Sequence, residues 1–260
     1  MSTLFPSSYK DLTTKEIVRI LPIVIQMHAH KENLAYIRNS LRKIILLLKL
    51  GNVEFFVALK KLSWIWNSKI EHKPFESFRV GWTRYYLPEA YFANTTGIEL
   101  AMANIYYLRF ATSQSIESFN ELIAILCRPR RWNWWFRRLG SSYDGEDRIA
   151  YNSIETGKVA KVFRKKLQVG YSFAVLQYFE SMNKRFMDAY KEVFEADESA
   201  KQLFANGEGW IATLEDVAKD GVHGSFERVC GVNAHTIWMY LKHNKIKTDE
   251  QLRQLEKNNA

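Results

Sequence analysis

Histidine and cysteine are the residues of this sequence most able to bind a transition metal, but their spacing does not form a metal site. His28 and His30 lie two residues apart, so a helix there would direct them to different faces. His223 and His235 lie on either side of Cys230, without the close pairs of ligands found in zinc modules. We interpret these histidines as ordinary core and surface residues, and we expect no bound metal or cofactor.

Catalytic motifs are also missing from the sequence, which lacks GxxxxGK, GxGxxG, HExxH, GxSxG and CxxC. Asp144, Glu146 and Asp147 resemble part of a calcium-binding loop, but the other ligands of such a loop are missing. We interpret these three acids as a solvated turn that offsets the charge of the arginines before it. The sequence therefore predicts a protein that is not an enzyme. An active site assembled from scattered residues is the alternative.

The residues best suited to binding a macromolecule lie between Phe119 and Leu139. The first half of this stretch is an apolar helical run, and Pro129 predicts that the helix ends near Arg128. The second half combines five arginines and four aromatic residues with no acid. Arginine and tryptophan dominate the energetically important positions of protein interfaces. The candidate partner-binding residues are Arg128, Arg130, Arg131, Trp132, Trp134, Trp135, Phe136, Arg137 and Arg138.

Two interpretations of segment 128–138 are open. In the first, which we favour, the segment is an exposed surface for a partner. That partner is either a protein or a nucleic acid, because phosphates attract arginine and bases stack on tryptophan. In the second, the tryptophans belong to the core and only the arginines are solvated. A membrane interface is less suitable, because so short a segment offers little area for it.

Composition indicates a folded helical protein with excess positive charge. Of its 260 residues, 47% are hydrophobic and 14% aromatic, which is enough for a large core. A net charge of +9 suits nucleic acid or an acidic neighbour in an assembly. Two cysteines form no disulfide framework, the N-terminus does not resemble a secretory signal, and no apolar run is long enough to span a bilayer. We therefore expect a soluble intracellular protein with no membrane partner.

Helix start signals locate several of the elements that would position segment 128–138. Three pairs have the spacing of a capping box, in which a threonine and a Glu or Gln three residues later bond each other's backbone N–H groups. They are Thr13 with Glu16, Thr96 with Glu99, and Thr248 with Gln251. In addition, we expect Ser113 to cap the helix before Arg128, Ser153 to open a later helix and Gly170 to break it.

The whole pattern predicts an all-α fold, an irregular bundle of about ten helices. Residues 67–92 lack helical periodicity, and we expect an ordered loop or brief strands there, held in place by aromatic side chains. A glycine-rich stretch at 206–209 indicates a hinge. The expected domains are therefore a main helical domain, residues 1–206, and a smaller C-terminal helical unit, residues 207–260, packed on it.

Four stretches in the middle of the chain follow one another in a recognisable order: LPEAYFANTTGIELAMANIYYLRF, FNELIAILCRPRR, DRIAYN and AVLQYFESMNKRF. Over about residues 85–245 this order resembles a group of helical proteins encoded in phage and prophage morphogenesis loci. The matching positions are Thr96-Gly97, Glu99, Leu122-Ile123-Ala124 and Arg128-Pro129, and GWIATLEDVAKDG with GSFERVCG resembles the end of the same proteins. Cys127 stands where an aromatic residue is expected, and WNWWFRR is not part of the pattern.

The resemblance implies a non-enzymatic role in virion assembly or structure, as a tail-assembly factor or as a tail or neck component. Its partners would be other virion or assembly proteins, with a homo-oligomer as a further possibility. Its location would be the host cytoplasm during assembly, or the virion itself. The alternative function is a basic nucleic-acid-binding protein that uses segment 128–138.

Overall fold

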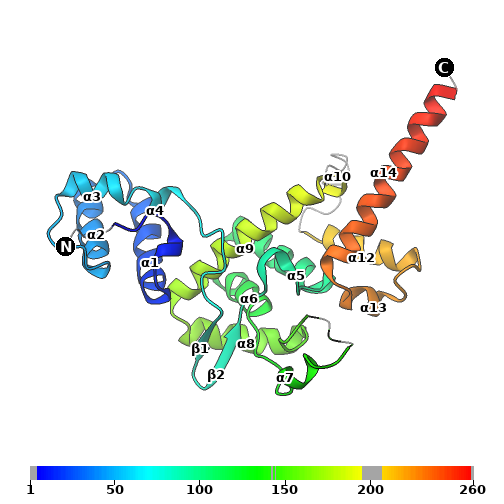
Figure 1. Ribbon diagram of the computed structural model, residues 1–260, viewed down its shortest axis with the longest axis horizontal. Coiled ribbons are helices and arrows are strands. Elements are labelled where there is room, and N and C mark those ends of the chain that lie inside the picture. The colour runs from blue at the N-terminus through cyan, green and yellow to red at the C-terminus, as the bar shows by residue number, and fades with distance from the viewer. Residues whose placement is uncertain (1–4, 142, 144, 195–206, 259–260) are drawn as a thin grey trace. The chain divides into compact units, whose positions relative to one another are not determined.

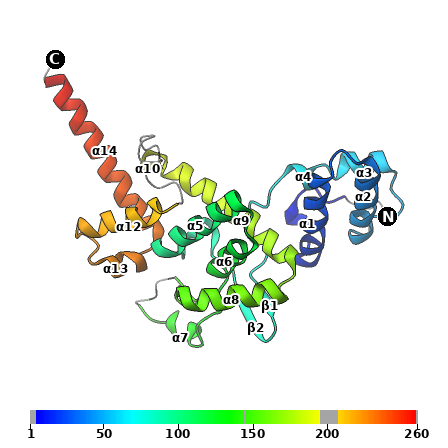
Figure 2. The ribbon, with the colours of Figure 1, turned by 180° about the vertical axis from the view of Figure 1, so that it is seen from behind.

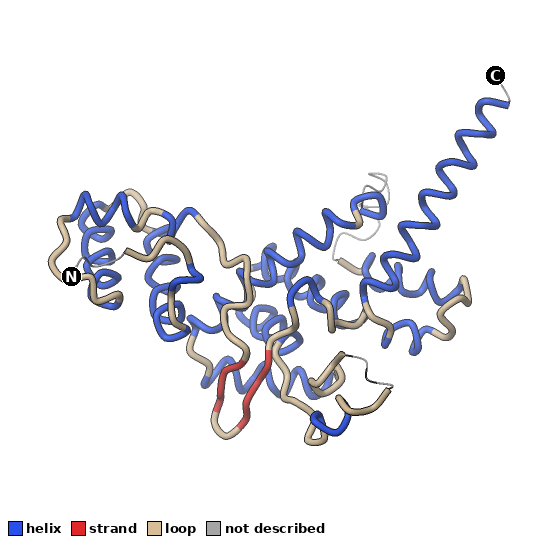
Figure 3. The backbone as a smooth tube through the Cα atoms, in the orientation of Figure 1, coloured by secondary structure: helices blue, strands red, loops and turns tan. Residues whose placement is uncertain are grey.

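The computed structural model describes residues 5–141, 143, 145–194 and 207–258. Within these residues, thirteen α-helices accompany one two-stranded sheet (Figures 1 and 3). The all-α fold class predicted from the sequence is confirmed. The chain divides into two compact units, Met1–Phe78 with Lys166–Ser181 (unit 1) and Arg79–Lys165 with Met182–Ala260 (unit 2). This grouping differs from the division expected at residue 206, a position that lies outside the described residues.

Unit 1 is built mainly from helices near the N-terminus. Its first long helix begins as predicted, because the side chains of Thr13 and Glu16 form a capping box. Pro22 lies inside that helix, and residues such as Ile20 and Leu21 are fully buried on its inner face. The elements are a 3-10 turn (Tyr9–Asp11), α1 (Thr14–Ala29), α2 (Leu34–Leu47), α3 (Phe55–Lys61), α4 (Trp64–Asn67) and the first part of α9 (Val169–Ala189).

The start of α9 packs closely on α1 at a glycine. A Cβ atom added to Gly170 would lie 1.8 Å from the backbone oxygen of Val18, so only glycine allows this approach. The predicted break between two helices is confirmed, although it falls at residues 167–168 and not at Gly170 itself. The preceding helix, α8 (Ser153–Lys166), ends before Gly170, and α9 begins at Val169 and runs through it. The helix start predicted at Ser153 is confirmed.

Residues 67–92 contain the only strands of the described residues, β1 (Ser77–Val80) and β2 (Thr83–Tyr86), drawn in red in Figure 3. They form a hairpin whose two-residue turn contains Gly81 at φ +59. The brief strands expected in this region are therefore confirmed. A 3-10 turn (Ala90–Phe92) follows the hairpin.

The central helix of unit 2 is α6, the apolar helix that precedes segment 128–138. Every residue from Leu122 to Leu126 of α6 is buried, which confirms a central helix covered on more than one side. Ser113 does not cap it, contrary to prediction, because Ser113 ends the preceding helix and Ser115 accepts the bond from the backbone N–H of Ser118 at 3.2 Å. The helices of unit 2 are α5 (Gly97–Ser113), α6 (Ile116–Leu126), α7 (Trp134–Arg137), α8, the end of α9, α10 (Lys191–Phe194), α12 (Gly209–Lys219), α13 (Phe226–Gly231) and α14 (Ala234–Asn258).

Helix α5 begins after Thr96 as predicted, but without a capping box. The side chain of Thr96 makes no capping hydrogen bond, and Glu99 is buried among arginines instead of bonding the helix start. Further along α5, Asn104 exchanges two hydrogen bonds with Asn183 of α9, of 3.2 and 2.8 Å, so both buried amides are satisfied.

The C-terminal helices α12, α13 and α14 all contact α5 within unit 2. The contact is close because a Cβ atom at Gly97 would lie 2.6 Å from the side chain of Ile237. Helix α14 is one continuous helix through Asn258, so the prediction that a new helix starts at Thr248 with Gln251 is wrong. No glycine or proline interrupts residues 234–258, and helical geometry therefore continues past Thr248.

Candidate functional site: the aromatic loop

Segment 128–138 leaves the core at the end of α6 and enters a loop closed at its base. Helix α6 ends at Leu126, close to the end predicted from Pro129. Antiparallel bridges then join Arg128 to Tyr86 of β2 and Arg130 to Arg148. The backbone N–H of Arg131 also donates to the oxygen of Asp147 at 2.8 Å. We call residues 130–148 the aromatic loop; it contains the short helix α7 (Figure 1).

Arg128 is not available to a partner, which corrects its assignment as a partner-binding residue. Its guanidinium lies 2.5 Å from a carboxylate oxygen of Glu99 and 3.5 Å from one of Glu146. Arg148 lies 2.6 Å from Glu146 and 3.5 Å from Glu99. All four side chains are less than 10% exposed, and we call them the buried ion cluster. Arg128 is held inward because two buried carboxylates need cationic partners.

Arg148 also forms hydrogen bonds with the backbone around this cluster. Its guanidinium donates to the backbone oxygens of Leu126, at 2.7 Å, and of Asn94, at 3.3 Å. Although burial alone would lower it, the pKa of Arg148 is raised by Glu99 and Glu146. Arg148 thus joins the end of α6 to the segment before α5, a role that no motif in the sequence indicates.

The acidic turn after α7 faces the arginines and not the solvent. Glu146 and Asp147 are both buried, so the expectation of a solvated turn is wrong for them, whereas the predicted pairing with nearby arginines is confirmed. Asp147 accepts hydrogen bonds from Arg138 and, at 2.7 Å, from Tyr143. Burial opposes ionisation of Asp147, but these bonds hold its pKa below the usual value. The third predicted acid, Asp144, lies outside the described residues.

Several arginines of the aromatic loop already make contacts with other residues of the chain. The guanidinium of Arg130 lies 4.0 Å from the centre of the Tyr86 ring and 3.8 Å from a carboxylate oxygen of Asp147. Arg131 donates to the backbone oxygen of Arg148 at 3.0 Å. Arg130 and Arg138 also lie over the ring of Trp134, at 4.7 and 5.0 Å, so this half-buried indole is part of the packing of the loop.

The remaining predicted rings are exposed. Trp132 is 86% exposed, Phe136 57% and Trp135 51%, and Leu139, which is not among the predicted partner-binding residues, is 82% exposed. The rings of Trp135 and Phe136 stack on each other, with centroids 3.6 Å apart. We call Trp132, Trp135, Phe136 and Leu139 the aromatic patch. It lies on a loop whose base is held by backbone bridges and by Asp147.

A further tryptophan, Trp82, is fully exposed at the turn between β1 and β2. The expectation that aromatic side chains hold residues 67–92 in place is met by Phe75, Phe78 and Tyr85, which are buried. It is wrong for Trp82, because the turn at Gly81 directs that residue away from the core. Figures 1 and 2 show the hairpin turn and α7 at the same end of unit 2.

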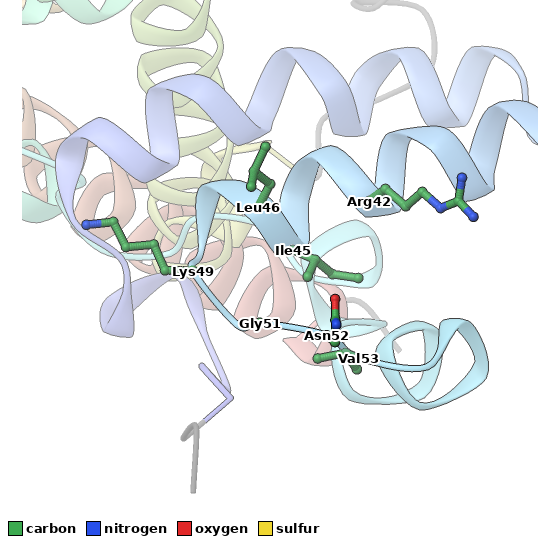
Figure 4. A pocket seen from close by; sticks show the side chains of 7 residues that line it. All are labelled: Arg42, Ile45, Leu46, Lys49, Gly51, Asn52 and Val53. Atoms are coloured by element: carbon green, nitrogen blue, oxygen red, sulfur yellow. The ribbon is translucent and has the colours of Figure 1, made fainter. Parts of the chain in front are cut away.

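Unit 1 contains an open cavity of 780 Å³ at the end of α2, between that helix and the segment before α3. Figure 4 shows Ile45 and Val53 near its centre, while the charged ends of Arg42 and Lys49 extend in opposite directions. Small-molecule sites usually have polar groups that converge on the ligand. Because these two cations diverge, the cavity does not form a comparable site.

Among the described residues, no group of three or more His, Cys, Asp and Glu side chains is placed to hold a metal ion. Nor does any helix there have the length and apolar character needed to cross a membrane. His235 is bonded within unit 2, with Nδ1 2.8 Å from the hydroxyl of Tyr190.

Comparison of the chain with protein-family models, curated proteins and solved structures gives no match.

Proposed function

We propose that this chain is a non-enzymatic protein of phage-type virion assembly or structure, acting through protein–protein contacts made by the aromatic patch. The observation that carries the proposal is that three aromatic rings and one leucine are exposed on a loop whose base is fixed. A preorganised aromatic cluster loses little conformational entropy on binding, which favours affinity. The assembly context, as a tail-assembly factor or a tail or neck component, comes from the resemblance over about residues 85–245. On this proposal the chain acts in the host cytoplasm during assembly or as part of the virion.

The charge of the aromatic loop supports a protein partner over a nucleic acid at this surface. Binding to a nucleic-acid backbone requires cations that are free to neutralise phosphates. Arg128 is buried, and Asp147 forms ion pairs with both Arg130 and Arg138. The side chains that the loop exposes are mainly aromatic, and such a surface fits an apolar groove on another protein.

The proposal is tested by placing a photo-crosslinking amino acid at position 132 and, separately, at position 135. Lys158 on α8 is a matched control position, because its side chain is also exposed and lies outside the patch. We expect positions 132 and 135, but not 158, to crosslink to one virion or assembly protein in particle-producing cells. Crosslinks to nucleic acid, or an equal pattern at all three positions, would contradict the proposal.

A second measurement separates binding from folding. Replacing Trp132, Trp135 and Phe136 with alanine should abolish the crosslinked complex while changing the melting temperature by only a few degrees, because exposed rings contribute little to stability. The single change Trp134→Ala should destabilise the fold more than the triple variant does. We expect a loss of about 1–2 kcal/mol, because the change removes two cation–π contacts. A large loss of stability in the triple variant would show that these rings belong to the core.

A further inference from the structure

The β1–β2 hairpin presents two arginines side by side on its outer face. A two-residue turn at Gly81-Trp82 pairs Val80 with Thr83, so the next pair across the strands is Arg79 and Arg84. Both arginines are exposed, whereas Phe78, Val80 and Tyr85 face inward and are buried. The hairpin therefore has one face that holds it to the protein and one that is cationic.

This arginine pair has no counter-charge of its own. The sequence of the strands and turn, SFRVGWTRYY, contains no acid. The nearest acid before it, Glu76, lies 2.7 Å from Lys73. Among the described residues, no ion pair reaches Arg79 or Arg84, in contrast to Arg130 and Arg138 of the aromatic loop. Like charges directly opposite each other destabilise a strand pair, so an anion bound across both arginines would stabilise the hairpin.

Trp82 stands in the turn of the hairpin, three residues after Arg79 and two before Arg84. It is fully exposed, and its neighbours in the turn and in β2 are Gly81 and Thr83. Neither supplies the apolar surround that a buried protein hot spot or a membrane anchor needs. A single exposed indole in a turn flanked by arginines instead suits stacking with a nucleobase, because stacking requires only the face of the ring.

The hairpin is also held firmly at its base. Tyr86 exchanges two backbone hydrogen bonds with Arg128, of 2.8 and 3.2 Å. The ring of Tyr85 packs edge-on against Phe163 of α8, with centroids 4.7 Å apart. The tip is therefore presented on a fixed support, which limits the conformational entropy lost when a ligand binds.

We propose that the outer face of this hairpin binds single-stranded nucleic acid, with an unstacked base on Trp82 and adjacent phosphates on Arg79 and Arg84. This site is separate from the aromatic patch and goes beyond the protein-docking function proposed for it. Single-stranded nucleic acid is the better fit because its bases are free to stack, whereas those of a duplex are already stacked on one another.

The test is fluorescence anisotropy of a labelled oligothymidylate titrated with the full chain at two or more salt concentrations. Loss of one base–aromatic stack should make Trp82→Ala bind about fivefold to a hundredfold more weakly, and Trp82→Phe should retain most of the affinity. In R79Q/R84Q, removal of two phosphate contacts should flatten the slope of log K against log salt by about 1.4.

Matched variants make the result specific. R164Q/R253Q removes the same amount of charge from exposed sites on α8 and α14, and it should bind like the wild-type chain. Trp132→Ala removes an exposed indole of the aromatic patch and should also leave oligonucleotide binding unchanged. Retention of a normal melting temperature in each variant shows that the fold is intact.

Several outcomes would overturn the hairpin site. These are no oligothymidylate binding by the wild-type chain at low salt, equal losses in Trp82→Ala and Trp132→Ala, or equal losses in the two double variants. Tighter binding to a duplex of the same length would assign the surface to double-stranded DNA. Cosedimentation with phosphatidylserine vesicles that is lost in Trp82→Ala, without oligonucleotide binding, would assign it to a membrane surface.

Discussion

Replacing Glu99 with glutamine tests whether the buried ion cluster holds Arg128 away from partners. In the wild-type chain two cations, Arg128 and Arg148, are balanced by Glu99 and Glu146 in a site where every side chain is less than 10% exposed. Glu99→Gln keeps the shape of the side chain but leaves two buried guanidiniums with one carboxylate. Breaking a buried ion pair in this way typically costs about 3–5 kcal/mol.

For a domain the size of unit 2, each kcal/mol corresponds to roughly 2–4 °C of melting temperature. We therefore expect Glu99→Gln to lower the melting temperature by roughly 6–20 °C, measured by circular dichroism and checked by urea denaturation. The matched control is Glu155→Gln, which removes an exposed ion pair with Lys158 and should change stability by at most about 1 kcal/mol.

A double variant makes the test sharper. Glu99→Gln with Arg128→Gln restores the charge balance, because Arg148 and Glu146 remain as a pair. Its loss of stability should be smaller than the sum of the two single losses by at least about 1 kcal/mol. If Glu99→Gln were no worse than Glu155→Gln, the cluster would be solvated, and the reason for excluding Arg128 from the binding surface would be wrong.

Two further expectations concern packing and pH. Gly170→Ala should destabilise the chain by about 3 kcal/mol or more in urea denaturation, because its Cβ would overlap the backbone of Val18. The control is Gly157→Ala in α8, whose Cβ would meet nothing within 4 Å. It should stabilise the chain by about 0.5–1 kcal/mol. Asp147→Asn should reduce stability at pH 7 by on the order of 1–2 kcal/mol. Because the pKa of Asp147 is lowered in the folded state, that difference should persist down to about pH 4, the unfolded value, and vanish as the pH falls through the folded value. A constant difference from pH 7 to pH 2.5 would contradict this assignment.

Local signals in the sequence predicted local features of the fold well. The Thr13 capping box, the helix end before Pro129 and the brief strands around Gly81 all depend on residues a few positions apart. Their energetics are decided within one turn of chain, so the sequence is sufficient to identify them.

Features that depend on distant residues could not be predicted in the same way. Thr96 with Glu99 has the spacing of a capping box, but Arg128 and Arg148 attract the carboxylate more strongly than a helix end does. The same pairing buries Arg128, although it belongs to the same arginine-rich segment as exposed Arg138. Only the fold brings these groups together.

The candidate site was predicted in part for a related reason. Composition identified the aromatic loop and its rings, but it gave no sign of which arginines Asp147 and Glu146 would pair with. Trp82 was grouped with the buried aromatic residues around it, because aromatic side chains are usually buried. Its position in a two-residue turn is what exposes it.

The bridge between Arg130 and Arg148 has a consequence for how the aromatic loop can vary. It fixes the two ends of the loop side by side, together with the bond from Ile149 to the backbone oxygen of Pro129 at 2.8 Å. Once the ends of a loop are fixed, doubling the number of residues between them costs only about 0.6 kcal/mol. Mutation can therefore lengthen, shorten or reshape this tip while the frame beneath it keeps its stability. Chains sharing this frame could thus evolve different partners by changing the tip alone.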